Sequence, residues 1–230
     1  MAATALLLSP HPDDLAWSLG GAVRGLTEAG VGLAGQTFFG TTRYAPGDPA
    51  HGTLEAVAVR AAEEDAWAAW AGVRLTRHDL SDASLRGYTD ETEMGAEPAA
   101  EVVDSAAALL GAALDAVAPD LVLAPLAVGG HVDHAAVRQA VLRVAPAAPV
   151  VWYEDLPYAD GRSAAYAAHT VTVDLGARWA AKATGVHHFP SQLPGEVLPV
   201  LHRHGERLWT DDAAAAALLT DLLAGSLVAS

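Results

Sequence analysis

Residues 9–14 read Ser-Pro-His-Pro-Asp-Asp and place one imidazole beside two adjacent carboxylates. His11 and Asp14 are three residues apart across a turn, so both side chains can converge on one point while Asp13 points elsewhere. Imidazole nitrogen and carboxylate oxygen are ordinary zinc ligands, and the carboxylate of Asp13 could then serve as general base for a metal-bound water. A competing interpretation is that Asp13 or Asp14 caps a helix near residue 16. Capping leaves His11 unexplained and is compatible with metal binding.

Residues 129–134 read Gly-Gly-His-Val-Asp-His and form a second segment of this kind. The two glycines allow the backbone to pass close to a ligand. His134 can supply a third zinc ligand and leave the fourth position open, as catalytic zinc sites require. Asp133 can accept a hydrogen bond from a neighbouring imidazole and fix its tautomer, while His131 is free to donate to a developing oxyanion. Alone, this segment is equally well explained as a surface loop or helix cap, but its pairing with residues 9–14 favours a metal site.

The strands and helices that must position these two segments can be predicted from the apolar runs of the sequence. Glycines and prolines mark where these runs end. Strands that alternate with helices indicate βαβ units. We therefore expect a single α/β domain over residues 1–230, a Rossmann-like three-layer sandwich with a mostly parallel sheet. Both segments follow predicted strands, and ligands of such sheets bind beyond the carboxyl ends of the strands. The predicted strands are 3–8, 31–39, 73–77, 120–124, 149–153 and 170–174, and the predicted helices are 16–29, 55–71, about 97–117, 133–144, 175–187 and a terminal helix over about 211–230.

The composition limits the partners and the metal ligands. The chain has 13 Lys and Arg against 28 Asp and Glu, a formal charge of −15, and no cysteine. Nucleic acid and anionic membranes are disfavoured because binding either rests on basic side chains, so the expected partner is a small-molecule substrate. Any metal must be held by His, Asp or Glu. No apolar run reaches the roughly 18 residues of a membrane span, and the start lacks a basic leader and a cleavage site, so we expect a cytoplasmic protein.

These residues resemble the PIG-L/LmbE family of zinc-dependent deacetylases, which carries an HPDD motif after the first strand and an HxDH motif after a later one. The resemblance covers about residues 3–210, and its weaker matches are the Arg60–Glu63 segment, residues 153–158, Lys182 and Ser191-Gln192. One departure is Leu15, where the family often has a glutamate. The glutamate is not one of the implied zinc ligands, so the implied metal binding is unaffected. The departure puts in question the side chains that support these ligands and the substrate class.

The resemblance implies a role for each matching residue. The implied zinc ligands are His11, Asp14 and His134. The implied catalytic residues are Asp13 as general base, protonated His131 as the electrophile that stabilises the tetrahedral intermediate, and Asp133 as the residue that orients its histidine neighbours. Arg60 matches a position that contacts sugar-type substrates.

The implied activity is zinc-dependent hydrolysis of an amide, the N-deacetylation of an N-acetylglucosamine-type sugar or of a sugar-bearing small metabolite such as an antibiotic scaffold. Two alternatives stay open: an amidase for a non-sugar N-acyl compound or thiol conjugate, and a zinc-containing binding protein without catalysis. Leu15 is the sequence feature that suggests the binding protein, whereas the intact Asp13 and His131 argue against it. The sequence also leaves a homo-oligomer open.

Overall fold

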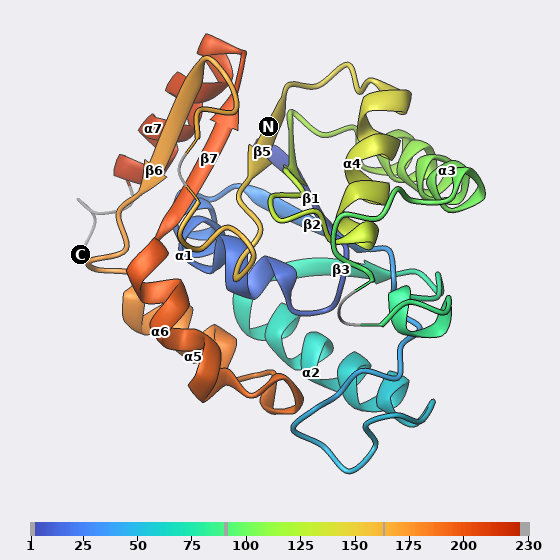
Figure 1. The fold of residues 1–230 in the computed structure, drawn as a ribbon. Coiled ribbons are helices and arrows are strands. Elements are labelled where there is room, and N and C mark those ends of the chain that lie inside the picture. Colours follow the sequence, from blue (N-terminus) through green and yellow to red (C-terminus); the bar gives the residue numbers. More distant parts are fainter. Residues whose placement is uncertain (1–2, 90–91, 163, 226–230) are drawn as a thin grey trace.

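The computed structural model describes residues 3–89, 92–162 and 164–225, which fold around one twisted sheet (Figure 1). Within these residues the sheet has seven strands in the spatial order β3-β2-β1-β4-β5-β7-β6. The first five are parallel to one another, whereas β7 runs antiparallel to both β5 and β6. The strands are β1 (Thr4–Ser9), β2 (Gly32–Thr37), β3 (Val73–Arg77), β4 (Leu121–Pro125), β5 (Val150–Tyr153), β6 (His169–Val173) and β7 (Glu206–Thr210).

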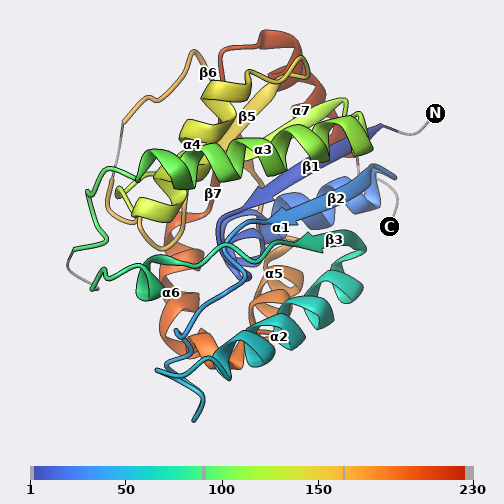
Figure 2. The same ribbon diagram turned by 90° about the vertical axis from the view of Figure 1, so that its right-hand side faces the viewer.

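Helices cover both faces of the sheet and complete the three layers (Figures 1 and 2). One face packs against α3 (Ala100–Val117) and α4 (Val132–Val144). The other packs against α1 (Asp14–Glu28), α2 (Ala56–Ala71) and α7 (Ala213–Gly225). Helix α5 (Trp179–Val186) lies on α1, and α6 (Pro194–His204) lies on α5. The predicted α/β architecture with a mostly parallel sheet is confirmed.

Strand β1 shows how an uninterrupted apolar run marks the centre of this sheet. Successive side chains of a strand alternate between its two faces. Leu7 accordingly packs in the core beneath α1, whereas Leu6 and Leu8 pack in the core beneath α3 and α4. Because helices cover both faces, no position of the strand needs to be polar. The run ends at Ser9, directly before the first candidate metal-binding segment.

Several helix boundaries differ from the sequence expectation, and three helix starts show why. Helix α1 begins at Asp14 instead of residue 16. Helix α5 begins at Trp179 instead of residue 175, because the Asp174 carboxylate accepts the backbone N–H of Gly176 (2.9 Å) in a turn. The terminal helix begins at Ala213, where the preceding Asp212 accepts backbone N–H groups of the first turn. The predicted helical residues 226–230 lie outside the described residues.

Helix α6 and strand β7 have no counterpart among the predicted elements. Strand β7 begins with two charged residues, yet Glu206 is 1% exposed. Its carboxylate accepts the backbone N–H groups of Gly21 (2.7 Å) and Ala22 (2.9 Å) and pairs with Lys182 Nζ (2.6 Å). A buried charge is tolerated when it is paired and hydrogen-bonded in this way. The pair ties β7 and α5 to α1, the helix whose first turn carries part of the candidate site.

None of the helices in the described part of the chain combines the length and the apolarity that crossing a bilayer requires.

Candidate metal centre and active site

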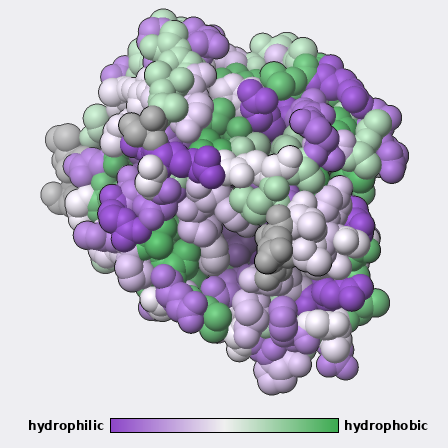
Figure 3. All heavy atoms as spheres, viewed as in Figure 1, coloured by the Kyte–Doolittle hydropathy of each residue, from purple (hydrophilic) through white to green (hydrophobic). Residues whose placement is uncertain are grey.

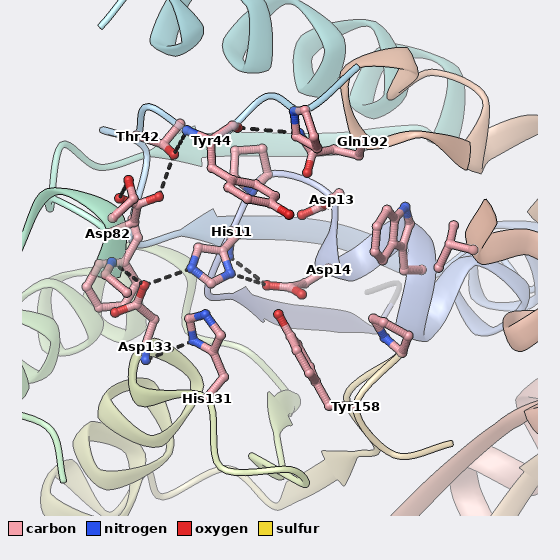
Figure 4. Close-up of a pocket in the computed structure, with 18 of the residues that line it drawn as sticks. His11, Asp13, Asp14, Thr42, Tyr44, Asp82, His131, Asp133, Tyr158 and Gln192 are labelled. Carbon is pink, nitrogen blue, oxygen red and sulfur yellow. Dashed lines mark hydrogen bonds and ion pairs between the residues drawn. The ribbon is translucent and has the colours of Figure 1, made fainter. Parts of the chain in front are cut away.

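The parallel pairing of β1 with β4 brings the two candidate segments together. His11 lies between β1 and α1, whereas His131 and His134 lie where α4 begins after β4. The ring centroids of His11 and His131 are 5.0 Å apart (Figure 4), and those of His11 and His134 are 5.2 Å apart. The predicted convergence of the two segments is therefore present in the structure.

One group of donor atoms in this cluster suits a divalent cation. Asp14 Oδ2 lies 3.4 Å from both His11 Nδ1 and His134 Nε2, and one ligand atom from each residue lies within 4.8 Å of the other two. His134 Nε2 is buried without a hydrogen-bond partner in the described residues, although buried polar atoms are nearly always paired. A cation held by these three atoms would satisfy it. The residues present thus fit the zinc site expected from the sequence.

The second ring nitrogen of His11 and that of His134 each contact a buried carboxylate, a different one for each histidine. His11 Nε2 lies 2.9 Å from Asp133 Oδ2, and His134 Nδ1 lies 2.6 Å from Asp155 Oδ1. These contacts leave His11 Nδ1 and His134 Nε2 to face Asp14. Carboxylate partners of this kind fix the ring orientation and make the imidazole a more basic ligand. Asp133 thus lies where it can orient a neighbouring histidine.

His11, His131 and Asp133 form a second group with metal-ligand spacing, but hydrogen bonds already engage its carboxylate. Asp133 Oδ2 accepts the backbone N–H of Ala83 (2.9 Å) in addition to its contact with His11, and Asp133 Oδ1 pairs with Arg86. The group that contains the unsatisfied nitrogen is therefore the better metal site.

The charges of the cluster favour a cation. Burial raises the pKa of Asp14, but His134 and His11 outweigh it and lower this pKa to about 2, so the carboxylate is ionised. Burial lowers the pKa of His11, but hydrogen bonds to Asp133 and Asp14 raise it well above its usual value. The pKa of His134 is also raised, because Asp14 and Asp155 outweigh burial. The carboxylates therefore stabilise positive charge here, which a divalent cation can supply in place of protons.

Asp13 lies beside this cluster and is 6% exposed. Its Oδ1 accepts a hydrogen bond from Arg60 Nη2 (2.9 Å), whereas Oδ2 has no partner in the described part of the chain. Asp13 occupies the N-cap position of α1 but makes no capping hydrogen bond there, and Asp14 Oδ2 accepts the backbone N–H of His11 instead. The capping interpretation is therefore wrong. Burial raises the pKa of Asp13, with Arg60 opposing. A carboxylate with one unshared oxygen on a cavity is suited to a general base.

Arg60, which the resemblance associates with sugar contacts, is 4% exposed and lines the cavity. Its guanidinium donates to Asp13 and to a backbone carbonyl of the loop before α2. In this structure Arg60 holds Asp13 in place, and its contact with a substrate stays a prediction. Glu63, one turn further along α2, accepts the N–H (2.7 Å) and O–H (2.6 Å) of Ser191. This contact fixes the segment that carries Gln192 into the cavity wall.

Leu15, where the family often has a glutamate, is 1% exposed and belongs to the core beneath α1. It packs toward Gly35 of β2 and does not line the cavity. The departure at this position therefore changes the core and leaves the cavity wall as it is. It gives no structural support to the non-catalytic alternative.

His131 provides a hydrogen-bond donor beside the cluster. Its Nδ1 accepts the backbone N–H of Asp133 (3.2 Å), so the proton of the neutral ring lies on Nε2. Burial and the positive charges of His11 and His134 lower the pKa of His131 to about 2. In this structure the ring is therefore neutral, and the protonated His131 expected for the metal-loaded protein stays a prediction. A neutral imidazole N–H can still donate to a developing oxyanion.

The cluster opens into a cavity of about 480 Å³, and the face shown in Figure 3 is hollowed near its middle. The lining is acidic: of the described residues, six carboxylates line it against the single guanidinium of Arg60. Asp82 is 6% exposed, and its carboxylate accepts hydrogen bonds from the hydroxyls of Thr42 and Ser84 instead of pairing with a cation. The cavity therefore suits a small polar ligand that carries positive charge. The six carboxylates belong to Asp13, Asp14, Asp82, Glu93, Asp133 and Glu196.

Asp155 is a site residue for which the sequence analysis gives no role. It directly follows β5 and lies at the same edge of the sheet as the two candidate segments, which is the signal that could have found it. The histidines at positions 51, 78, 169, 187, 188, 202 and 204 do not line the cavity.

We predict that Asp155→Asn weakens zinc binding by about 10–100-fold, because His134 loses the carboxylate that orients it. Competition with a fluorescent zinc chelator would measure the change. Asp160→Asn is the matched control, because Asp160 lies in the same loop and pairs with the exposed Arg203 outside the cavity. Equal zinc affinity in the two variants would contradict the role of Asp155.

Comparison with known proteins gives matches over most of the chain. Residues 6–145 match the family model of PIG-L, GlcNAc-PI de-N-acetylase. A 2'-N-acetylparomamine deacetylase of Streptomyces fradiae is 35% identical over 255 aligned positions, which cover 92% of this chain and 82% of that protein.

Solved structures share the fold. A deacetylase triple mutant of the teicoplanin biosynthetic pathway has a TM-score of 0.75 at 23% identity and covers 90% of this chain and 97% of its own. The zinc inhibited form of teicoplanin deacetylase Orf2 has a TM-score of 0.74 at 22% identity, with 90% and 97% covered. At this level of identity the two structures support the fold alone. The family match spans more than half of the chain and agrees with the relative from Streptomyces fradiae, so the chain belongs to the PIG-L family.

Proposed function

We propose that the protein is a metal-dependent amide hydrolase that removes the acetyl group from an N-acetylated amino sugar. The observation that carries this proposal is the juxtaposition of three elements in one cavity. They are the donor set of His11, Asp14 and His134, the unshared oxygen of Asp13, and the Nε2–H donor of His131. The deacetylase activity of the relative from Streptomyces fradiae supports the same reaction class.

The donor set favours zinc, because two imidazole nitrogens and one carboxylate oxygen are typical zinc ligands and the chain has no thiolate to offer. When bound, such a cation supplies a Lewis acid that makes a neighbouring water more acidic and a carbonyl carbon more electrophilic.

The protein side chains supply the proton transfers. Asp13 accepts a proton from the attacking water through its unshared oxygen while the water oxygen forms a bond to the acetyl carbon. His131 donates its Nε2–H to the carbonyl oxygen as that oxygen gains negative charge, an effect typically worth about 3–4 kcal/mol per donor. Asp13 then passes the proton to the nitrogen as the C–N bond breaks. The products are acetate and a free amine.

The acidic lining supports an amino-sugar substrate over an N-acyl amino acid. Neither Asp82 nor Glu196 forms an ion pair with Lys or Arg in the described residues, and the guanidiniums of Arg60 and Arg86 are already paired with Asp13 and Asp133. A substrate carboxylate would be repelled, whereas a sugar that carries a further ammonium group would be attracted.

A panel of acetamides tests the proposal. The zinc-loaded protein should release acetate and amine from 2'-N-acetylparomamine and from N-acetylglucosamine conjugates. It should release little from N-acetylated amino acids or acetylated thiol conjugates. Faster hydrolysis of the anionic N-acetyl amino acids would overturn the substrate class, and no release from any acetamide would overturn the proposed reaction.

A further inference from the structure

The hydroxyl of Tyr158 is a polar group of the cavity to which the mechanism above gives no role. It makes no hydrogen bond with any residue in ranges 3–89, 92–162 and 164–225, and the half-buried side chain lies in the cavity wall. Figure 4 shows this hydroxyl pointing into the cavity toward Asp14. The group therefore offers an O–H beside the candidate metal ligands that a bound molecule can use.

The ring of Tyr158 is held in this position from several sides. Its centroid lies 5.5 Å from that of His131 and 5.3 Å from that of His134, with the latter pair edge to face. The backbone of the loop is fixed by a hydrogen bond from Ala159 N to the Asp155 carbonyl (2.8 Å). Asp155 is the residue that also holds His134, so the loop after β5 positions both a candidate ligand and this hydroxyl.

Gly129 allows the close approach of the two loops. Its φ of +98° favours glycine, and a Cβ at this position would lie 2.6 Å from the Cβ of Tyr158. Any side chain at position 129 would therefore push Tyr158 away from the cluster. The glycine of the second candidate segment thus serves the placement of this ring.

We propose that Tyr158 is a second donor to the reacting carbonyl, which gives its O–H to the acetyl oxygen beside the Nε2–H of His131. This inference rests on the proposed function. Its basis is the placement of the ring against both histidines, with the unpartnered hydroxyl directed at the centre of the cluster. The phenol donates a hydrogen bond and transfers no proton, so the proton balance of the reaction is unchanged. Because the oxygen gains charge during the attack, the bond strengthens as the reaction proceeds.

A competing role is that of a cavity wall that contacts the substrate through its ring. Tyr158→Phe separates the two roles because it keeps the ring and removes the O–H. Tyr166→Phe is the matched control, since Tyr166 is 37% exposed, packs against Trp209 and does not line the cavity.

The first measurement does not depend on turnover. Methylphosphonate has the methyl group and the tetrahedral oxygens of a hydrated acetyl group, and its affinity for the zinc-loaded protein can be measured by calorimetry. Tyr158→Phe should bind it at least about tenfold more weakly, whereas Tyr166→Phe should bind it like the unmodified protein. Equal affinity in all three proteins would overturn the proposal. This comparison decides on Tyr158 even if the acetamide panel contradicts the proposed reaction.

The second measurement uses the best acetamide of the panel. Tyr158→Phe should lower kcat by roughly 10–100-fold, somewhat less than the loss seen for a full oxyanion donor. KM and the zinc content should stay within about twofold of the unmodified protein, since the expected contact forms with the developing charge. A rise in KM with unchanged kcat would overturn the proposal in favour of a substrate-binding wall.

Discussion

The variant His134→Ala is expected to lose both tight zinc binding and hydrolysis. His134 is 1% exposed, and its Nε2 is the buried nitrogen that lacks a partner in the described residues. Its removal leaves two of three donor atoms and also deprives Asp155 of its imidazole partner, so that its backbone hydrogen bond from Val128 remains. We expect zinc affinity to fall by more than about 100-fold, beyond the 10–100-fold that loss of an outer partner typically costs. Metal analysis after dialysis against a chelator, combined with acetate release, measures both effects.

The matched control for this variant is His187→Ala, because His187 is exposed and lies outside the cavity. It should keep the zinc content and the activity of the unmodified protein. The unmodified protein should lose activity on chelation and regain it when zinc is added back. If His134→Ala retains one zinc per chain after the same dialysis, the metal lies elsewhere and the assignment of His11, Asp14 and His134 is wrong.

The fold was predictable where the local signals and the tertiary contacts agree. Residues 5–8 of strand β1 are all apolar because helices cover both faces of the strand, and a buried parallel strand is expected to look like this. Strand β7 was not predicted from the sequence because Glu206 makes the segment look like a surface loop. What buries this residue is its contact with Lys182 and the backbone of α1, which come from parts of the chain 24 and about 185 residues away. A local pattern cannot contain that information.

The same distinction applies to the site. His11, Asp14 and His134 could be identified because each lies in a short segment with metal-ligand residue types at the end of a predicted strand. Asp155 and Tyr158 lie at the end of another strand, but their segment contains no histidine and so has no metal-like spacing. The role of Arg60 depends on a contact with Asp13 across 47 residues, which only the packing of α2 beside α1 creates.

The protonation state of His131 could not be predicted from the sequence for a related reason. The spacing of His131 and Asp133 is compatible with either protonation state. The structure favours the neutral ring with its proton on Nε2, because Nδ1 accepts the backbone N–H of Asp133. The chemistry of a histidine therefore follows from its partners more than from its motif.

The variant Asp13→Asn is expected to bind zinc like the unmodified protein and to turn over at least about 1,000-fold more slowly. General base catalysis typically contributes 10²–10⁴-fold, and here Asp13 is expected to handle the proton both in the attack and in the departure of the amine. Asparagine has nearly the same shape, so the packing of α1 and the three metal ligands should be preserved. Single-turnover acetate release and metal analysis of the same preparation separate the two quantities.

Asp115→Asn controls for the loss of one negative charge, because Asp115 is exposed on α3, outside the cavity. It should leave both turnover and zinc content unchanged. Loss of zinc in Asp13→Asn would mean that this carboxylate is a metal ligand, and turnover near that of the unmodified protein would mean that the water loses its proton to another group. The expected combination is full zinc content with little turnover. It requires that the adjacent carboxylates have different roles, with Asp14 as a metal ligand and Asp13 as the general base. The structure supports this division because His11 and His134 lie within 3.4 Å of Asp14, whereas Arg60 holds Asp13 and leaves one of its oxygens to the cavity.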